Sequence, residues 1–406
     1  MREGWKVAKL EDVAQVVNGG TPKTKVPEYW GGEHFWITPA EMGGLESPYI
    51  ESSRRCLTDA GLKNSSASLL PRNSVILSTR APIGHLVINA ERMAFNQGCR
   101  GLIPRGEAHY KYLYYFLYGS VNLLNDLGSG TTFKELSAGK LKKVEVPLPP
   151  LSEQKRIVAI LDEAFAGIAT AVANTEKNLA NARELFESYL NSVIGGYANK
   201  YELTELHRVA DFQGGSQPPK SVFLREPRDG YVRLLQIRDF KSDEKAVFIP
   251  VSRKNRLCEP SDIMIGRYGA SVGQIHTGKG GAYNVALIKA TPNKERLNKR
   301  YFYYYLLSNL FQQPLASVAS RSAQAGFSKE DIARFAVPLP PIREQERAVE
   351  SFDDLHGQVV RLEKLFESKL SSLNELKQSL LQKAFSGELT AGKAASDAMR
   401  QVEEIA

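Results

Sequence analysis

A proline-rich string of thirteen residues occurs twice in this chain of 406 residues. The first copy, Val-Pro-Leu-Pro-Pro-Leu-Ser-Glu-Gln-Lys-Arg-Ile-Val, covers 146–158, and the second, Val-Pro-Leu-Pro-Pro-Ile-Arg-Glu-Gln-Glu-Arg-Ala-Val, covers 337–349. Nine of the thirteen positions are identical at a constant offset of 191 residues. Proline pairs occur in many loops, but a shared string of this length indicates an internal duplication. We therefore expect one structural unit to occur twice.

The duplication divides the chain into lobes and helical segments that alternate. We predict a first lobe at 1–145, a proline joint with a long helix at 146–196, a second lobe at 197–336, a second joint with its helix at 337–390, and a polar tail at 391–406. The lobes repeat more loosely than the joints. Gly19 parallels Gly215, and Ala94–Asn96 parallels Ala282–Asn284. The lobes are therefore expected to share a scaffold and to differ in their loops.

Two stretches have the composition and periodicity of long helices. Residues 152–194 lack proline, and their apolar residues recur at alternating spacings of three and four from Val158 to Val193. This seam predicts a coiled-coil helix with Ser152 as its N-cap and Gly195–Gly196 at its end. A matching seam runs from Phe352 to Leu380. Two such helices are expected to pack on each other, and antiparallel pairing would relate the halves by a pseudo-two-fold axis.

The lobes predict a mixed α/β (α+β) fold class. In the first lobe, 74–78 and 85–88 are short apolar runs bounded by proline and glycine, as expected of strands. The aromatic run Tyr110–Leu117 favours a helix, with a buried strand as the alternative. The predicted architecture is two similar lobes, each followed by one helix of an antiparallel coiled coil.

The net charge of +8 is distributed unevenly along the chain. Residues 1–150 and 197–341 carry +4 and +9, whereas 151–196 and 342–406 carry −2 and −3. A basic excess confined to the two lobes is typical of proteins that bind polyanions. A solvated basic surface is the alternative, but its presence in both lobes favours nucleic acid.

Cysteine content and hydropathy bear on the compartment. The three cysteines, Cys56, Cys99 and Cys258, are far apart and form no CxxC pair, which fits buried thiols in a reducing cytosol. No apolar run reaches the roughly 20 residues of a membrane span, and Met1–Lys6 lacks the apolar core of an export signal. We expect a cytoplasmic protein that does not enter a membrane.

Catalytic motifs are mostly missing. Gly273–Gly280 resembles a phosphate-binding GxxxxGK[ST] loop, but Gly280 stands where a hydroxyl is needed and no helical pattern follows. Asp243–Lys245 matches the short (D/E)xK end of a nuclease site, but no Pro-Asp precedes it at a suitable distance. The histidines have no metal-ligand spacing. We predict no catalytic residue and no metal site.

Basic clusters in the lobes are the candidates for DNA contacts. Arginine is best suited to read guanine edges, whereas lysine more often neutralises phosphate. The candidates are Arg54, Arg55, Arg80 and Arg100 in the first lobe, and Arg253, Lys254, Arg256, Arg267 and Tyr268 in the second. For each of them, a solvated surface position is the alternative.

The order of these elements resembles the specificity subunit of type I restriction–modification systems. The doubled Val-Pro-Leu-Pro-Pro-x-x-Glu-Gln string carries most of the resemblance, and Gly19–Pro22, Glu28–Trp30, Gly128–Gly130 and Leu380–Gly387 add to it. The resemblance covers essentially residues 5–390. The second lobe departs from it at Gly214-Gly-Ser-Gln-Pro218, which lacks a full Gly-Gly-Thr-Pro copy.

The resemblance implies a non-catalytic DNA reader whose lobes each bind one half of a split, asymmetric sequence. The coiled coil sets the gap between the halves and docks two methyltransferase subunits, and restriction–translocase subunits join them. The methyl donor, ATP and magnesium are then expected on the partner subunits, with no cofactor on this chain. The resemblance assigns the spacing of the half-sites and the docking of partner subunits to the joint residues Pro147, Pro149, Pro150, Glu153 and Gln154, and Pro338, Pro340, Pro341, Glu344 and Gln345.

Two other hypotheses stay open at the level of sequence. A bilobed coiled-coil scaffold would organise protein partners without reading DNA, and would show no salt-sensitive binding to duplex DNA. A restriction enzyme in its own right would cleave or methylate DNA as a single chain, but the missing motifs argue against it.

Overall fold

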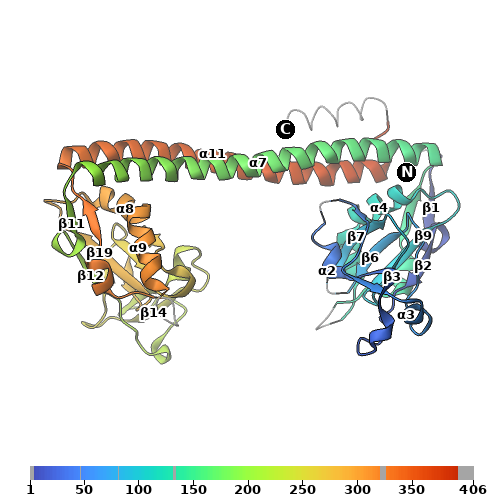
Figure 1. Cartoon of the computed structure of the whole chain (residues 1–406), viewed down its shortest axis with the longest axis horizontal. Helices are drawn as coiled ribbons and strands as arrows, with labels where there is room; N and C mark the ends of the chain where they lie inside the picture. Colours follow the sequence, from blue (N-terminus) through green and yellow to red (C-terminus); the bar gives the residue numbers. More distant parts are fainter. Residues whose placement is uncertain (1–3, 46, 81, 131–133, 321–325, 392–406) are drawn as a thin grey trace. The chain divides into compact units, whose positions relative to one another are not determined.

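The chain forms two compact units, described here one at a time (Figure 1). The computed structural model describes residues 4–45, 47–80, 82–130, 134–320 and 326–391. Unit 1 comprises Met1–Glu176 with Glu367–Ala406, and unit 2 comprises Lys177–Phe366. Each unit therefore contains one lobe and a segment of each long helix. Apart from Ala391, the predicted polar tail lies outside the described residues.

The first lobe is built on two sheets and a two-stranded ribbon. One sheet has the strand order β2-β9-β6-β7-β4, the other has the order β5-β3-β8, and the ribbon pairs β1 with β10. Neighbours are antiparallel except for the parallel pairs β4–β7 and β3–β8. The strands are β1 (Lys6–Lys9), β2 (Ala14–Asn18), β3 (Trp30–Ile37), β4 (Tyr49–Ile50), β5 (Arg55–Leu57), β6 (Val75–Thr79), β7 (Ile83–Asn89), β8 (Met93–Phe95), β9 (Cys99–Pro104) and β10 (Glu145–Leu148). The two strands predicted from sequence are confirmed as β6 and β7.

Helices of the first lobe are short, apart from the one formed by the aromatic run. They are α1 (Leu10–Val13), α2 (Pro39–Met42), α3 (Asp59–Lys63), α4 (Tyr110–Gly119), α5 (Val121–Leu127) and α6 (Ala138–Lys142), with a 3-10 turn η1 (Pro27–Tyr29). The prediction of a helix at Tyr110–Leu117 is confirmed by α4. Six of its ten residues are buried, which explains why its sequence is apolar on more than one face.

The second lobe repeats this topology apart from one edge strand of each sheet. Its sheets have the orders β12-β19-β16-β17 and β14-β13-β18-β15, and β11 pairs with β20. Here too the second sheet contains one parallel pair, β13–β18. The strands are β11 (Leu203–Glu205), β12 (Ala210–Gly214), β13 (Tyr231–Leu235), β14 (Val247–Pro250), β15 (Leu257–Cys258), β16 (Ile263–Gly266), β17 (Ile275–His276), β18 (Gly281–Tyr283), β19 (Leu287–Pro292) and β20 (Ala336–Pro338). The helices are α8 (Lys299–Leu307), α9 (Asn309–Ala319) and α10 (Lys329–Ala333), with 3-10 turns η2 (Leu206–Arg208), η3 (Lys220–Val222), η4 (Ile237–Phe240) and η5 (Gly269–Ser271).

The glycines paired by the sequence repeat occupy the same place in the two lobes. A Cβ added to Gly19 would lie 2.0 Å from the carbonyl oxygen of Asn96, and one added to Gly215 would lie 2.0 Å from that of Asn284. No side chain fits at such a distance, so both positions require glycine. The predicted shared scaffold is thereby confirmed at the level of individual backbone contacts.

The long helices are α7 (Leu151–Lys200) and α11 (Ile342–Ser386). In unit 1, the beginning of α7 lies beside the end of α11, since Lys377 Nζ lies 4.9 Å from the ring centroid of Phe165. In unit 2, the end of α7 lies beside the beginning of α11, and Arg183 Nε donates to Glu363 Oε1 (2.7 Å). The pairing is therefore antiparallel in each unit, as predicted from the two seams.

Both predicted boundaries of the first helix are wrong. The helix runs through Gly195 and Gly196 to Lys200, because Ile194 is fully buried and Tyr197 packs 6.3 Å from Tyr301. This packing outweighs the roughly 1 kcal/mol that each glycine costs in a helix. Ser152 lies inside the first turn and is not the N-cap.

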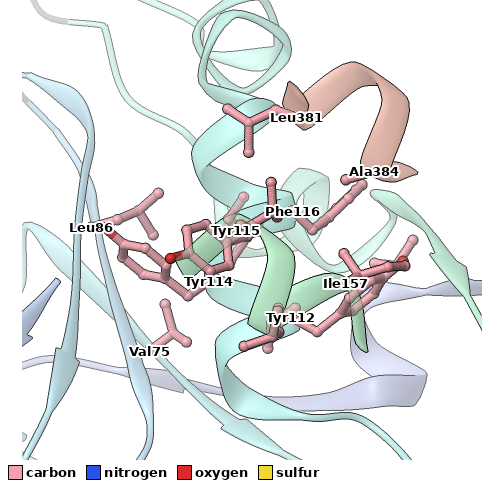
Figure 2. Close-up of a cluster of buried hydrophobic side chains, with 14 of the residues drawn as sticks. Val75, Leu86, Tyr112, Tyr114, Tyr115, Phe116, Ile157, Leu381 and Ala384 are labelled. Atoms are coloured by element: carbon pink, nitrogen blue, oxygen red, sulfur yellow. The ribbon is translucent and has the colours of Figure 1, made fainter. Parts of the chain in front are cut away.

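Unit 1 has a continuous hydrophobic core where its lobe meets the long helices. Figure 2 shows Tyr112 and Phe116 of α4 beside Ile157 of α7 and Ala384 of α11. The ring of Phe385 contacts both Tyr112 (5.3 Å between centroids) and Phe116 (5.4 Å). The lobe and the helical segments of unit 1 therefore share one core, which limits independent motion of the lobe.

Among the described helices, α7 has the length and hydropathy that a membrane span would need, with a mean hydropathy of 1.5 over its most apolar stretch. A packed helix of a soluble protein meets the same criterion. Buried apolar residues of α7 belong to the cores of both units, where they cluster with residues of α11 and of the lobes.

Candidate nucleic-acid interface

In unit 1 the joint between lobe and helix is held by a buried glutamine. The side chain of Gln154 is fully buried in the first turn of α7. Its Oε1 accepts from the amide of His109 (2.8 Å), and its Nε2 donates to the carbonyls of Glu107 (3.0 Å) and Pro149 (2.9 Å). One side chain thus ties the proline string to the segment that precedes α4.

The same arrangement occurs in unit 2. Gln345 is fully buried. Its Oε1 accepts from the amide of Asn298 (2.8 Å), and its Nε2 donates to the carbonyls of Arg296 (3.0 Å) and Pro340 (2.9 Å). The three bonds match those of Gln154 atom for atom, so the repeated glutamine has the same role in both units.

Prolines complete the joint. The carbonyl of Pro150 accepts from the amides of Glu153 and Gln154, and the carbonyl of Pro341 does the same for Glu344 and Gln345. Each helix therefore starts directly after a residue whose ring restricts the backbone. Pro147 and Pro338 lie in the ribbon strands, where their carbonyls accept from the hydroxyls of Tyr112 and Tyr301. The buried Pro149 and Pro340 precede the helices, each providing one of the carbonyls bound by the glutamine.

These contacts correct one part of the predicted role of the joint. Gln154 and Gln345 were expected to take part in docking, but they have no exposed surface with which to touch a partner. Glu153 and Glu344 are half-buried and bond within their own units, to Thr390 and Tyr201 respectively. The role of the joint as a stiff spacer remains a prediction.

A carboxylate on each long helix forms a second connection to the lobe. In unit 1, Asp162 accepts from Lys111 Nζ and from the hydroxyl of Tyr115, both at 2.6 Å. In unit 2, at the offset of 191 residues, Asp353 accepts from Arg300 Nε (2.8 Å) and from the hydroxyl of Tyr304. Each aromatic helix of a lobe is thereby bonded to a long helix by charge-assisted hydrogen bonds.

Replacing Asp353 with asparagine is expected to lower the free energy of unfolding by about 1 kcal/mol at pH 7, because the site is half-exposed and partly screened. Burial of the carboxyl opposes ionisation, but the Tyr304 hydroxyl and the Arg300 guanidinium together lower the pKa of Asp353. A lowered pKa stabilises the fold above the ordinary carboxyl range, and that contribution is lost as the pH falls through the folded-state value. Urea unfolding at pH 7 and at a pH below the lowered pKa of Asp353 should therefore show the difference from wild type only at pH 7.

The matched control for this variant is Asp354→Asn. Asp354 is exposed, and it accepts only from Gln358, one turn along the same helix. Its replacement should change stability little at either pH. An equal loss in both variants would contradict the proposed connection at Asp353.

The four basic candidates of the first lobe lie on two different sheets. Arg54 and Arg55 are exposed at the start of β5, whereas Arg80 follows β6 and Arg100 lies in β9. Arg80 Nε lies 3.8 Å from Glu135 Oε2. The Nη1 of Arg100 donates to the carbonyls of Gln97 (3.1 Å) and Cys99 (3.0 Å). Arg100 therefore supports its own backbone, and Arg54 and Arg55 are the more accessible pair.

Two of the candidates in the second lobe line one cavity. Arg256 and Arg267 lie with Lys329 around a cavity of about 590 Å³. Arg267 Nε donates to the carbonyl of Phe327 (2.7 Å), and its guanidinium lies 4.9 Å from the ring centroid of Tyr268. Tyr268 is 42% exposed. Asp211 and Glu330 also line the cavity, so its three cations outnumber its carboxylates by only one. Cations beside an accessible aromatic ring are suited to contacts with a nucleic-acid backbone and its bases.

Sequence reasoning missed Lys329 at this cavity. It stands at the first position of α10, after the N-cap Ser328, far along the chain from Arg256 and Arg267. Only the fold brings these residues together. Arg253 and Lys254 lie instead on an exposed turn and are absent from the described lining of the cavity.

Arg80 and Tyr268 occupy equivalent positions in the two lobes. Each forms an isolated bridge to the segment before the last short helix, Arg80 to Glu135 and Tyr268 to Gly326. Glu135 and Gly326 are separated by the same offset of 191 residues as the joints. The two lobes thus present different chemistry, a guanidinium and a phenol, from the same place on one scaffold.

The rejected nuclease and phosphate-loop motifs meet in one ion-pair network. Asp243, of the (D/E)xK match, lies 2.5 Å from Arg233 Nη2 and also pairs with Lys279, of the loop Gly273–Gly280. Hydrogen bonds from both cations lower the pKa of Asp243 to about 2. No group of three or more metal-ligating side chains occurs among the described residues. Both motifs are therefore parts of an ion-pair network on the surface of the lobe.

A cavity of about 610 Å³ in unit 1 lies beside the residues Asp162, Lys111 and Tyr115, which connect the long helix to the first lobe. Lys377 lines it, with its Nζ 5.0 Å from the ring centroid of Tyr118. The residue at the equivalent position of unit 2, Phe186, packs its ring against Tyr304 (6.0 Å) and His356 (5.1 Å). A lysine in unit 1 thus stands where unit 2 has a phenyl ring.

The cysteines agree in part with the predicted buried thiols. Cys99 and Cys258 are buried, and burial raises the pKa of their thiols to about 12 and about 11. Cys56 is only partly buried. The two buried thiols are protonated at neutral pH and are poor nucleophiles.

Comparison with known protein families matches residues 2–180 and 199–370 to the type I restriction modification DNA specificity domain. The chain is 27% identical to the type I restriction enzyme MjaIX specificity subunit of Methanocaldococcus jannaschii, over 95% of this chain and 93% of that protein. It is 24% identical to the type I restriction enzyme EcoKI specificity subunit of Escherichia coli, over 96% of this chain and 90% of that protein.

Two solved structures share the fold. A chain from a study of complex assembly and conformational transition of the type I R-M system aligns with a TM-score of 0.80 and 21% identity, covering 96% of this chain and 99% of that chain. The crystal structure of the HsdS subunit from Thermoanaerobacter tengcongensis aligns with a TM-score of 0.57 and 21% identity, covering 96% and 98%.

Proposed function

The chain belongs to the type I restriction–modification DNA specificity family, and from this membership we propose that it recognises a split, asymmetric DNA sequence, one half per lobe. The observation that carries the proposal is the contrast between scaffold and surface. The sheet order, the glutamine joint and the carboxylate connection are repeated in both units. The exposed groups presented by that scaffold are not repeated, as Arg80 and Tyr268 illustrate.

The charge of the lobes supports a role in binding duplex DNA. Residues 1–150 carry +4 and residues 197–341 carry +9, while the helical segments are mildly acidic. Neutralisation of phosphates by lysine and arginine supplies most of the non-specific affinity for DNA and makes it depend on salt. Contacts to base edges then supply the sequence preference. In this proposal the lobes do both, and the joints hold each lobe at a set angle to its helix.

The long helices are proposed to set the gap between the half-sites and to dock two methyltransferase subunits, with restriction–translocase subunits joining them. Docking requires exposed surface, and the helical segments of unit 2 expose several large apolar side chains, Leu185 (58%), Leu362 (40%) and Leu365 (60%) among them. Exposed apolar side chains of this kind are typical of protein contacts. Chemistry would then reside on the partners, which would hold the methyl donor, ATP and magnesium, and the complex would act in the cytoplasm.

Exchange of residues 1–145 for the first lobe of another specificity subunit tests the proposal. We expect one half of the methylated sequence to change completely and the other half to stay the same. Methylated positions would be mapped by sequencing the DNA of cells that express the hybrid with its methyltransferase partners. The reciprocal exchange of residues 197–336 is the matched control and should change only the other half.

An unchanged methylated sequence, or a change in both halves, would contradict a modular reader. The scaffold hypothesis makes a different prediction for the purified complex. If duplex binding by the complex with its methyltransferase partners did not weaken between 50 and 200 mM salt, where a DNA reader should lose on the order of 1,000-fold or more, organisation of protein partners alone would be favoured.

A further inference from the structure

Arg55 is held flat on a tryptophan in the first lobe. Its guanidinium carbon lies 3.5 Å from the ring centroid of Trp30 and 5.6 Å from that of Trp36. The two indoles contact each other edge to face, with centroids 5.1 Å apart. Arginine is able to stack on an aromatic face while its N–H groups, which lie in the guanidinium plane, stay available for other partners.

The aromatic platform is itself anchored. Trp36 is buried, and its indole N–H donates to the carbonyl of Gly20 (2.9 Å). The indole N–H of Trp30 donates to the carbonyl of Lys23 (3.3 Å). The hydroxyl of Ser53 joins β3 to the start of β5, since it accepts from the amide of Trp36 (2.9 Å) and donates to the carbonyl of Arg55 (2.6 Å). Both the platform and the backbone of Arg55 are therefore held in place.

Arg55 is exposed, and its N–H groups have no carboxylate partner among the described residues. Two arginines of the second lobe behave differently. Arg233 pairs with Asp243, and Arg300 pairs with Asp353. Arg55 thus combines a fixed orientation with free donors, which lowers the conformational entropy lost when a ligand binds.

The second lobe shows that the scaffold does not require an arginine here. Trp36 pairs with Arg55 on one side and with Ala94 on the other. In the second lobe, Leu234 pairs with Val247 on one side and with Ala282 on the other. Because Ala282 repeats Ala94, Val247 stands at the position of Arg55. Val247 is buried in an apolar cluster, so Arg55 serves the first lobe alone.

From these observations we propose that Arg55 is a specificity-determining residue, which donates two parallel hydrogen bonds to the N7 and O6 atoms of a guanine in the half-site read by the first lobe. The inference rests on the proposed function. A planar fork with fixed orientation matches the two acceptors that guanine presents in the major groove. Val247 offers no such donors, so the second half-site is not read from this position.

The variant Arg55→Lys tests the proposal, because lysine keeps the charge and loses the fork. The complex with its methyltransferase partners would first be used to map the wild-type methylated sequence. Equilibrium binding would then be measured on the cognate duplex and on duplexes in which each guanine of the first half-site is replaced in turn. We expect wild type to discriminate against replacement at one of these guanines on the order of 10- to 100-fold. Arg55→Lys should lose discrimination at that position and retain it in the second half-site.

Two further variants separate readout from folding. Arg72→Lys alters an exposed arginine of the first lobe that is not among the candidates for DNA contacts, and should leave discrimination as in wild type. Trp30→Ala removes the platform and should weaken discrimination at the same guanine while Arg55 is still present. Melting temperatures of all variants would verify that the first lobe is folded, and Trp30→Phe restores a ring if Trp30→Ala does not fold.

Three outcomes would overturn the proposal. Uniform weakening of all duplexes by Arg55→Lys would indicate a phosphate contact, because phosphate contacts do not distinguish sequences. Unchanged discrimination, or a first half-site without guanine, would leave Arg55 without a base to read. If wild type methylated no split sequence at all, the proposed function would fail first, and that result is distinct from a normal split site that is indifferent to Arg55.

Discussion

Replacing Gln345 with alanine is expected to destabilise unit 2 by about 3 kcal/mol. The variant removes both donors and the acceptor of a fully buried side chain. The amide of Asn298 and the carbonyls of Arg296 and Pro340 then lose their partners. Each buried unpaired group costs about 1–3 kcal/mol, and partial relaxation keeps the total below the sum.

Urea unfolding combined with amide hydrogen exchange at residues 296–298 measures this effect, because exchange reports local opening within unit 2. Gln154→Ala should cause a loss of the same size in unit 1, with faster exchange at residues 107–109. The matched control is Glu346→Ala, which changes the exposed neighbour of the buried Gln345 in the same helix start and should leave stability and exchange unchanged. If the amides of Gln345→Ala exchanged their hydrogens at the wild-type rate, the joint would not depend on this side chain.

Insertion of seven residues into each long helix is expected to lengthen the gap of the recognised sequence and to leave both half-sites intact. The insertions would follow Glu176 in α7 and Phe366 in α11, where the chain passes from one unit to the other. Seven residues preserve the heptad seam and extend a helix by about 10 Å. At about 3.4 Å per base pair, the gap should grow by roughly three base pairs.

Mapping of methylated sites in cells that express the extended protein measures the gap directly. The same seven residues added after Ala391 should leave the site unchanged, because α11 ends at Ser386. An unaltered gap in the extended protein would contradict the role of the helices as a spacer. Loss of the identity of either half-site would contradict the separation of spacing from recognition.

Much of the fold was predictable because its signals are local. Two strands of the first lobe, the helix at Tyr110–Gly119 and both long helices follow from apolar periodicity and from prolines that restrict the backbone. Pairing of the long helices was expected from their two seams, whereas the antiparallel direction was a further prediction that the seams do not determine. The end of the first helix did not follow, because the packing of Ile194 and Tyr197 in the core of unit 2 carries the helix through two glycines that by themselves predict a stop.

For the candidate site, the sequence predicted only the kinds of residue involved and not their arrangement. Arginine content indicated which residues are able to read DNA, but not which of them are free to do so. Arg100 bonds to its own backbone, and Arg256 joins Arg267 only across the folded lobe. The platform under Arg55 lies 25 residues away in sequence and is brought there by the pairing of β3 with β5.

The proline string illustrates the division between what sequence and structure determine. By itself the sequence showed that a unit occurs twice and that prolines precede each long helix, because identity at a constant offset and the restricted φ of proline need no other part of the chain. Tertiary structure alone decided why the glutamine of that string is repeated. Two of its three partners are backbone groups more than forty residues away, and a hydrogen bond over that distance exists only once the lobe has folded onto its helix.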